Sequence, residues 1–215
     1  MRTALDFTSG TIYLRPQPIA FEDSVVIDAQ TLLSTRRSVP IPALRAPAPE
    51  GAELDDILVE AMRVPDHGKL APWRFILFRG DGARKMGQKL ADVAERREGT
   101  LGEGRRAYEE TRFTRAPLVV GVVSTAKPHF KIPEWEQVLS VGAATMNLIH
   151  AAHARGYGAN WITEWVAYDD DAKAIMGIKA DEKVAGFVYI GTVSERPSDR
   201  PRPAITDHVV EAGAA

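Results

Sequence analysis

The chain has 215 residues, of which 45% are hydrophobic, enough for one domain with a substantial core. Its formal net charge of −2 lacks the basic surplus typical of proteins that bind nucleic acids, so we expect no nucleic-acid partner. The absence of cysteine excludes disulfides, thiolate nucleophiles and cysteine-ligated metals, and the lack of a signal-peptide core or long apolar run predicts a cytoplasmic protein without membrane contact.

Two helices are predicted in the first third of the chain. Residues 1–25 are polar and aperiodic, so we expect an N-terminal arm. Apolar residues recur at helical spacing from about 26 to 36 and from 51 to 63. Four prolines between these segments predict a stiff, extended connector over 38–49.

A strand and one or two surface helices are predicted next. Residues 74–78 are apolar and aromatic, as in a strand, and Gly80–Gly82 reads as a turn. A charged surface helix is expected over 83–97. The charged stretch 98–115 is compatible with a second helix.

Buried elements dominate the rest of the chain. Residues 118–123 and 184–190 are apolar runs typical of buried strands, and 159–163 is a third expected strand. The longest predicted helix covers 133–155 and has little polar surface, which indicates burial in a core or an oligomer interface. A short helix is expected over 169–176.

The order of elements favours helices packed on a sheet, because helices and short apolar strands are interleaved. No G-x-G-x-x-G follows the first strand, and no P-loop is present, so a Rossmann or P-loop nucleotide site is not predicted. The segment 193–215 is rich in proline and arginine and cannot form a core of its own.

A phosphate-binding motif is one interpretation of Arg36, Arg37 and Ser38. Guanidinium groups and a hydroxyl match the acceptor oxygens of a phosphate. The alternative is a solvated basic helix end, which the helix dipole also favours. Arg196, Arg200 and Arg202 near the C-terminus could add phosphate contacts, although each is also typical of a solvated tail.

The segment from Arg63 to Lys69 contains Pro-Asp-His and is a second candidate site. Arg63 and His67 could reach a phosphate or a ribityl chain, and Lys69 could place positive charge near the pyrimidine edge of a flavin. The alternative is a turn in which Asp66 accepts hydrogen bonds from its own backbone.

Aromatic and histidine residues give weaker signals. Trp73 and Trp161 lie at predicted strand ends and could line a flat-ring pocket, but core packing is the favoured interpretation for each. His150 and His153 lie three residues apart on the long helix, but H-E-x-x-H spacing is absent. They are more typical of core or interface residues than of a metal site.

The order of these motifs resembles the FMN-dependent nitroreductase family, in particular its compact bacterial branch with Arg-x-Pro-Asp-His. The resemblance implies an α+β fold in which helices sandwich a mixed central sheet, within an intertwined homodimer. Residues 26–192 would form the FMN-binding domain, and 193–215 would wrap the partner subunit. The matching stretches are 35–38, 62–75, 115–123, 133–161 and 183–192.

The resemblance also implies roles for individual residues. Arg36, Arg37 and Ser38 would contact the phosphate and ribityl chain of FMN, and Arg63 and His67 would reach it from the opposite subunit. The backbone of Trp161, Ile162 and Thr163 would edge the isoalloxazine ring. The chain departs from the family in having Lys69 for Asn, Ala71 for Gln, Ile162 for Arg and Pro40 for Lys.

We therefore expect an FMN-dependent NAD(P)H oxidoreductase with no catalytic side chain of its own. NADH or NADPH would reduce flavin N5, and a nitroaromatic, quinone or similar electron-poor small molecule would then take the electrons in ping-pong order. Two alternatives remain open: a flavin-binding protein without efficient reductase turnover, and a metal-dependent hydrolase using His150 and His153.

Overall fold

A computed structural model describes residues 27–213 of the chain. The predicted arm, 1–25, lies outside the described residues, and so does residue 26, where the first helix was expected to begin. Within the described part, no helix is long and apolar enough to cross a membrane.

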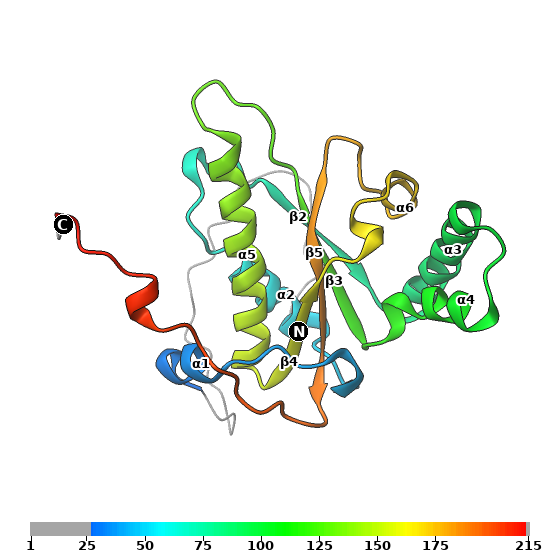
Figure 1. The fold of residues 1–215 in the computed structure, drawn as a ribbon, viewed down its shortest axis with the longest axis horizontal. Helices are drawn as coiled ribbons and strands as arrows, with labels where there is room; N and C mark the ends of the chain where they lie inside the picture. The colour runs from blue at the N-terminus through cyan, green and yellow to red at the C-terminus, as the bar shows by residue number, and fades with distance from the viewer. Residues whose placement is uncertain (1–26, 214–215) are drawn as a thin grey trace.

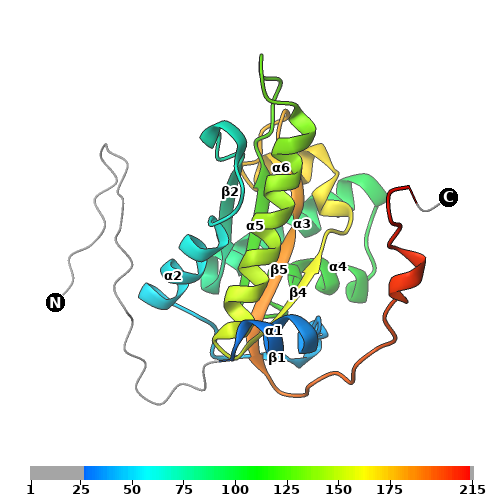
Figure 2. The same ribbon diagram turned by 90° about the vertical axis from the view of Figure 1, so that its left-hand side faces the viewer.

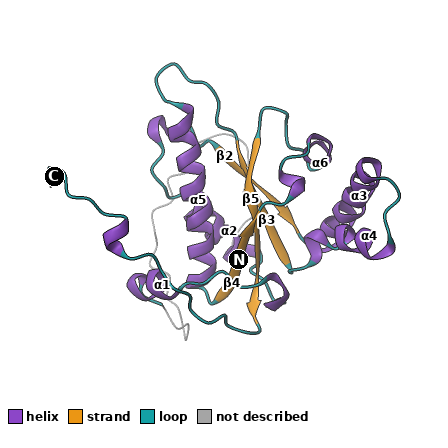
Figure 3. Ribbon diagram, in the orientation of Figure 1, coloured by secondary structure: helices purple, strands orange, loops and turns teal. Residues whose placement is uncertain are grey.

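The centre of the fold is a five-stranded sheet (Figures 1 and 3). The long strand β5 pairs with β4 along one edge and with β3 along the other. Next to β3 lies β2, and β1 pairs with β5 beyond the end of β3. The strands are β1 (Leu44–Arg45), β2 (Trp73–Phe78), β3 (Leu118–Ser124), β4 (Tyr157–Ile162) and β5 (Lys183–Val193).

Every strand pair among residues 27–213 is antiparallel, so the expectation of a mixed sheet is wrong for this part of the chain. The registers place Phe75 opposite Val122, and Val120 opposite Val188. The strands that follow one another in the chain and also pair, β2 with β3 and β4 with β5, run in opposite directions.

Helices cover both faces of the sheet, as predicted for an α+β sandwich (Figures 1 and 2). One face carries α1 (Ala29–Thr35), α2 (Gly51–Ala61) and α5 (Glu134–Ala154), and the other carries α3 (Gly80–Glu98), α4 (Glu103–Glu110) and α6 (Asp170–Ile175). Short 3-10 turns lie at Ile41–Ala43, His67–Lys69, Arg112–Thr114, Trp165–Ala167 and Ile205–Asp207.

The alternation of side chains along β3 creates two cores, one on each face of the sheet. Val120 and Val122 pack in the cluster that includes Leu148 of α5. Val119 and Val123 pack on the opposite face in the cluster of α3. All seven residues of β3 are buried, which confirms the prediction of a strand covered on both faces.

Two local predictions are wrong. The expected turn at Gly80–Gly82 is the first turn of α3: Gly80 has φ +53°, so the chain changes direction there and the helix begins at once. The proline-rich connector also contains β1, because Leu44 and Arg45 find their partners far away in β5. The charged stretch 98–115, which is compatible with a second helix, contains α4.

Candidate functional site

The arginine motif, Arg36, Arg37 and Ser38, follows the end of α1 and is held against β4. Arg36 is the C-terminal cap of α1, and its backbone N–H donates to the carbonyl of Leu32. Two residues after Arg37, the Val39 N–H donates to the Ala159 carbonyl at 3.0 Å, and Asn160 Nδ2 donates to the Val39 carbonyl at 2.7 Å. These bonds to β4 set the direction in which the motif leaves the helix.

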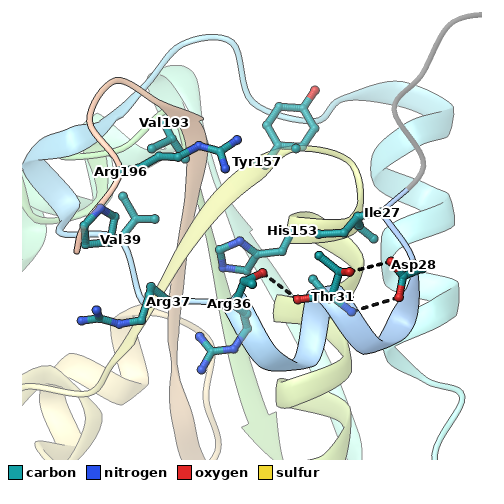
Figure 4. Close-up of a pocket in the computed structure, with 15 residues that line it drawn as sticks. Ile27, Asp28, Thr31, Arg36, Arg37, Val39, His153, Tyr157, Val193 and Arg196 are labelled. Atoms are coloured by element: carbon teal, nitrogen blue, oxygen red, sulfur yellow. Dashed lines mark hydrogen bonds between the residues drawn. The ribbon is translucent and has the colours of Figure 1, made fainter. Parts of the chain in front are cut away.

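A cavity of about 520 Å³, here called the arginine cavity, lies between α1, the last turn of α5, the start of β4 and the segment after β5 (Figure 4). This volume is within the usual range for small-molecule sites. Ser38 does not line the cavity, although Arg36 and Arg37 do. The polar or charged lining residues are Asp28, Thr31, Thr35, Arg36, Arg37, His153, Tyr157 and Arg196.

Positive charge dominates this cavity. Burial and then the nearby Arg202, Arg37 and Arg200 lower the pKa of Arg36. The nearest carboxylate to Arg37 is that of Asp199, whose Oδ1 lies 3.8 Å from Arg37 Nη1. Nη1 is itself buried and has no hydrogen-bond partner among the described residues. A buried donor among several guanidinium groups is suited to an anion.

His153 completes the cavity wall from α5. Its Nε2 is buried and has no hydrogen-bond partner within residues 27–213. Burial, followed by the charges of Arg36, His150 and Arg196, lowers the pKa of His153 to about 4. No group of three or more His, Asp or Glu in the described part of the chain could hold a metal ion, which removes support for the hydrolase hypothesis.

The Pro-Asp-His segment forms a tight loop after α2. The Asp66 carboxylate accepts from the backbone N–H of Leu70 at 3.1 Å and of Ala71 at 2.8 Å, as in the predicted turn. Helix α5 holds the loop from its other side: Ser140 Oγ donates to the Pro65 carbonyl at 2.9 Å, and Asn147 Nδ2 donates to the Arg63 carbonyl at 3.0 Å.

This loop has an unusual backbone, since Gly68, Lys69 and Ala71 all have positive φ. Gly68 has φ +74°, which favours glycine, and a Cβ there would displace the end of the Ile132 side chain. Non-glycine residues with positive φ persist where the surrounding structure fixes them, often at binding sites. Next to them, His67 Nδ1 lies 2.7 Å from Glu136 Oε2 on α5, and both side chains are about half exposed.

The end of β4 presents three residues in different environments. The Trp161 indole N–H donates to the Ala185 carbonyl at 3.0 Å and its ring lies over Gly186. Ile162 packs against the core on the α3 side of the sheet. The Thr163 hydroxyl accepts from the Tyr168 hydroxyl at 3.3 Å.

Glu164 follows in a backbone conformation that is almost confined to glycine, with φ 62° and ψ 179°. Its carboxylate is paired with Arg112, which is only 1% exposed, and lies 3.7 Å from Arg115. Arg112 is also paired with the fully buried Glu109. This buried network fixes the turn that follows Thr163, and nothing in the sequence pattern indicated it.

The structure brings only some of the predicted residues together within one chain. The arginine motif lies beside β4 and, through it, near the Trp161 segment. Arg63 and His67 form a separate group along α5, where they contact Asn147 and Glu136, and Lys69 follows in the same loop. The sequence favours a core or interface role for His153 and offers Arg196 either as a phosphate contact or as a solvated tail residue; the structure places both in the wall of the arginine cavity.

Comparison with known proteins gives a consistent result. A model of the nitroreductase family matches residues 33–192. "Putative NAD(P)H nitroreductase YdjA" of Escherichia coli K12 is 33% identical over 187 residues, covering 84% of this chain and 99% of that protein. "Putative NAD(P)H nitroreductase" of Haemophilus influenzae is 40% identical over 172 residues, covering 79% of this chain and 91% of that protein.

The fold is shared with solved structures at lower identity. The crystal structure of the FMN and NADPH-dependent nitroreductase NfnB from Sphigopyxis sp. strain HMH aligns with a TM-score of 0.65 and 19% identity. The alignment covers 87% of this chain and all of that one.

Proposed function

The chain belongs to the nitroreductase family, and from that premise we propose that it is an FMN-dependent NAD(P)H oxidoreductase acting on nitroaromatics, quinones or similar flat, electron-poor molecules. The oxidoreductase class follows from the family. The cofactor, the order of electron transfer and the substrate class are the proposal. We propose the cytoplasm as its location, where NADH and NADPH are supplied.

The observation that carries the proposal is the arginine cavity. An FMN phosphate brings close to two negative charges and three acceptor oxygens. Arg36, Arg37 and Arg196 face the cavity, and Arg37 Nη1 is a buried donor without a partner in residues 27–213. Placing a dianion there would relieve repulsion among the guanidinium groups and satisfy that donor. The residues present therefore fit a phosphate.

The ring of the cofactor would lie along the end of β4. Arg36 is fixed beside this strand through Val39, so a ligand anchored at the cavity can extend past Asn160 towards Trp161 and Thr163. Bound FMN would supply hydride acceptance from NAD(P)H and hydride donation to the acceptor at N5. The chain would contribute phosphate anchoring, a rigid ring edge fixed by the Glu164 network, and exclusion of water.

We also propose that the protein is a homodimer built on the outer face of α5. Trp135 is 68% exposed and Leu139 is 54% exposed on that face. They continue into the partly buried Gly142, Ala143 and Met146 at helical spacing. A large apolar strip of this kind marks a protein interface. Arg63 and His67 lie along the same helix and Lys69 follows in their loop, where a partner's flavin would meet them.

The segment after β5 supports this assembly. It leaves the body of the domain, as Figures 1 and 2 show, and all its residues from 200 to 213 are exposed. Ile205, Val209 and Val210 are apolar residues in that segment, exposed by 75%, 59% and 89%. A segment with no core of its own and several apolar side chains is expected to pack on a second subunit. Obligate dimers bury about 2,000–5,000 Å², and we propose that α5 and this segment both contribute to that area.

A spectrum of the purified protein tests the proposal. We expect a yellow protein with absorbance near about 450 nm that bleaches on addition of NADH or NADPH without oxygen. A yellow protein that neither nucleotide reduces would favour the alternative of a flavin-binding protein without turnover, which the apolar surroundings of Ile162 also motivate. Colourless protein that takes up no added FMN would reject both.

A further inference from the structure

The arginine cavity contains a titratable residue other than arginine, His153, which has no assigned partner in the phosphate site described above. Two of its polar residues are already occupied: the Asp28 carboxylate accepts from Thr31 N at 3.0 Å and Thr31 Oγ1 at 2.6 Å, and the Tyr157 hydroxyl donates to Glu53 Oε2 at 2.8 Å. Apart from the arginines, the remaining titratable wall residue is His153.

His153 is held where it can reach a ligand. It lies in the last turn of α5 and lines the cavity together with the small residues Ala154 and Gly156. In Figure 4 the imidazole lies at the centre of the group, between the Arg36 and Arg196 side chains in this view. Its Nε2 is buried and lacks a hydrogen-bond partner among the residues the structure describes, although buried polar atoms usually have one.

The charges around the ring determine its protonation state. In the unliganded cavity, burial and the nearby cations lower the pKa of His153 to about 4, so the imidazole is neutral at pH 7. Three carboxylates lie around the cavity: Asp28 is engaged by Thr31, Glu53 is engaged by Tyr157, and Asp199 lies 3.8 Å from Arg37 Nη1. The groups facing His153 from the packed elements are Arg36 and Arg37 after α1, His150 on α5, Tyr157 on β4 and Arg196 after β5.

A phosphate would reverse this balance. A dianion within hydrogen-bond distance favours the charged imidazolium, and an opposite charge at about 4–6 Å typically raises a pKa by about 1–3 units. We propose that His153 is a ligand of the phosphate group of the cofactor: when a tetrahedral dianion enters, the ring takes up one proton from solvent and donates from Nε2 to an anion oxygen. This inference rests on the proposed function, because FMN is the natural source of that dianion.

Proton uptake makes the affinity for the anion depend on pH, and the direction of that dependence follows from the change in the pKa of His153. The pKa of His153 is higher in the complex than in the free protein, so affinity rises as pH falls from the bound towards the free pKa. Sulfate is the appropriate probe, because it keeps two charges over this range whereas a phosphate monoester titrates near pH 6. With a shift of about two units, sulfate should bind roughly tenfold more tightly at pH 5.0 than at pH 7.5.

Calorimetric titration of the full chain with sulfate at the two pH values, in buffers of different ionisation enthalpy, measures both affinity and proton uptake. His153→Gln should lose the pH dependence and the proton uptake. His150→Gln is the matched control: it removes a histidine one turn away on α5 that does not line the cavity, and it should keep both. A histidine NMR titration of the unmodified protein, with and without sulfate, tests the same shift without any variant.

The outcomes separate the inference from the proposed function. If His153→Gln retains the pH dependence, if the NMR pKa does not rise, or if sulfate does not bind, His153 is not a phosphate ligand. FMN binding with unchanged pH behaviour in His153→Gln would overturn this inference and leave the flavin proposal standing. Sulfate binding with the predicted proton uptake in a protein that takes up no FMN would overturn the flavin proposal and leave an anion site containing His153.

Discussion

Replacing Arg36 by alanine should weaken FMN binding without weakening the fold. Hydrogen bonds to a charged group contribute about 1.5–3 kcal/mol, so the dissociation constant of FMN should rise about 10- to 150-fold. The unliganded fold should not suffer, because the Arg36 side chain forms no hydrogen bond or ion pair in residues 27–213 and lies among like charges. Its backbone bond to Leu32 survives the substitution.

Quenching of FMN fluorescence gives the affinity, and thermal unfolding without flavin gives the stability. Arg74→Ala is a suitable contrast, because Arg74 bonds Glu182 through Nε at 3.0 Å and the Gly177 carbonyl through Nη2 at 2.8 Å, away from the arginine cavity. We expect Arg74→Ala to lower stability by about 1–3 kcal/mol, since it leaves the buried Glu182 without its cation, and to keep FMN affinity.

Two results would refute the assignment of Arg36. The first is an FMN dissociation constant within a factor of two of the unsubstituted protein. The second is a fall in the melting temperature of the flavin-free Arg36→Ala protein comparable to that of Arg74→Ala, which would make Arg36 a structural residue.

Three further predictions follow from other parts of the chain. His67→Ala should weaken FMN binding about two- to twelvefold, the worth of one neutral hydrogen bond, but change stability by less than about 1 kcal/mol because its pair with Glu136 is exposed; flavin content and melting temperature report these. Leu139→Asp should weaken the association of the proposed dimer by at least about 2 kcal/mol, which raises its dissociation constant roughly 30-fold. Light scattering over a dilution series measures this, and an unchanged mass at every dilution would count against that interface. Arg74 and a backbone N–H lower the pKa of Glu182 from 4.5 to about 2 in the folded protein. The ionised carboxylate therefore stabilises the fold fully above pH 4.5, the pKa in the unfolded chain, and this contribution is lost as the pH falls from 4.5 to 2. Glu182→Gln should make the free energy of unfolding less dependent on pH in that interval, and an unaltered pH dependence would contradict the pairing.

Elements with a strong local pattern were predictable from the sequence. Helix α5 and strand β3 owe their form to long apolar runs, and both were located to within a few residues. Strand β1 could not be foreseen, because its two residues are strand only by pairing with Thr192 and Val193, almost 150 positions away. Glycines at 80 and 82 read as a turn because the sequence does not show that the backbone continues directly into α3.

The candidate site shows the same division. Arg36 and Arg37 were identifiable because two adjacent arginines form a local motif. The position of His153 in the cavity wall was not, since the segment after the last strand, with Arg196, completes that wall. The Glu164 conformation was equally hidden, because it depends on Arg112 being buried beneath that turn. Asp66, in contrast, forms its turn with its immediate neighbours and was read correctly.

Helix α1 buries none of its residues, and its Leu33 is 66% exposed. Seven residues are too few for a stable helix in water, and the cap at Asp28 alone does not change this. The arginines that follow are therefore carried by a helix that is not stable without its neighbours. During biosynthesis this segment leaves the ribosome early but can pack only after α5 and β4 exist, so binding of the proposed FMN should be among the last events of maturation.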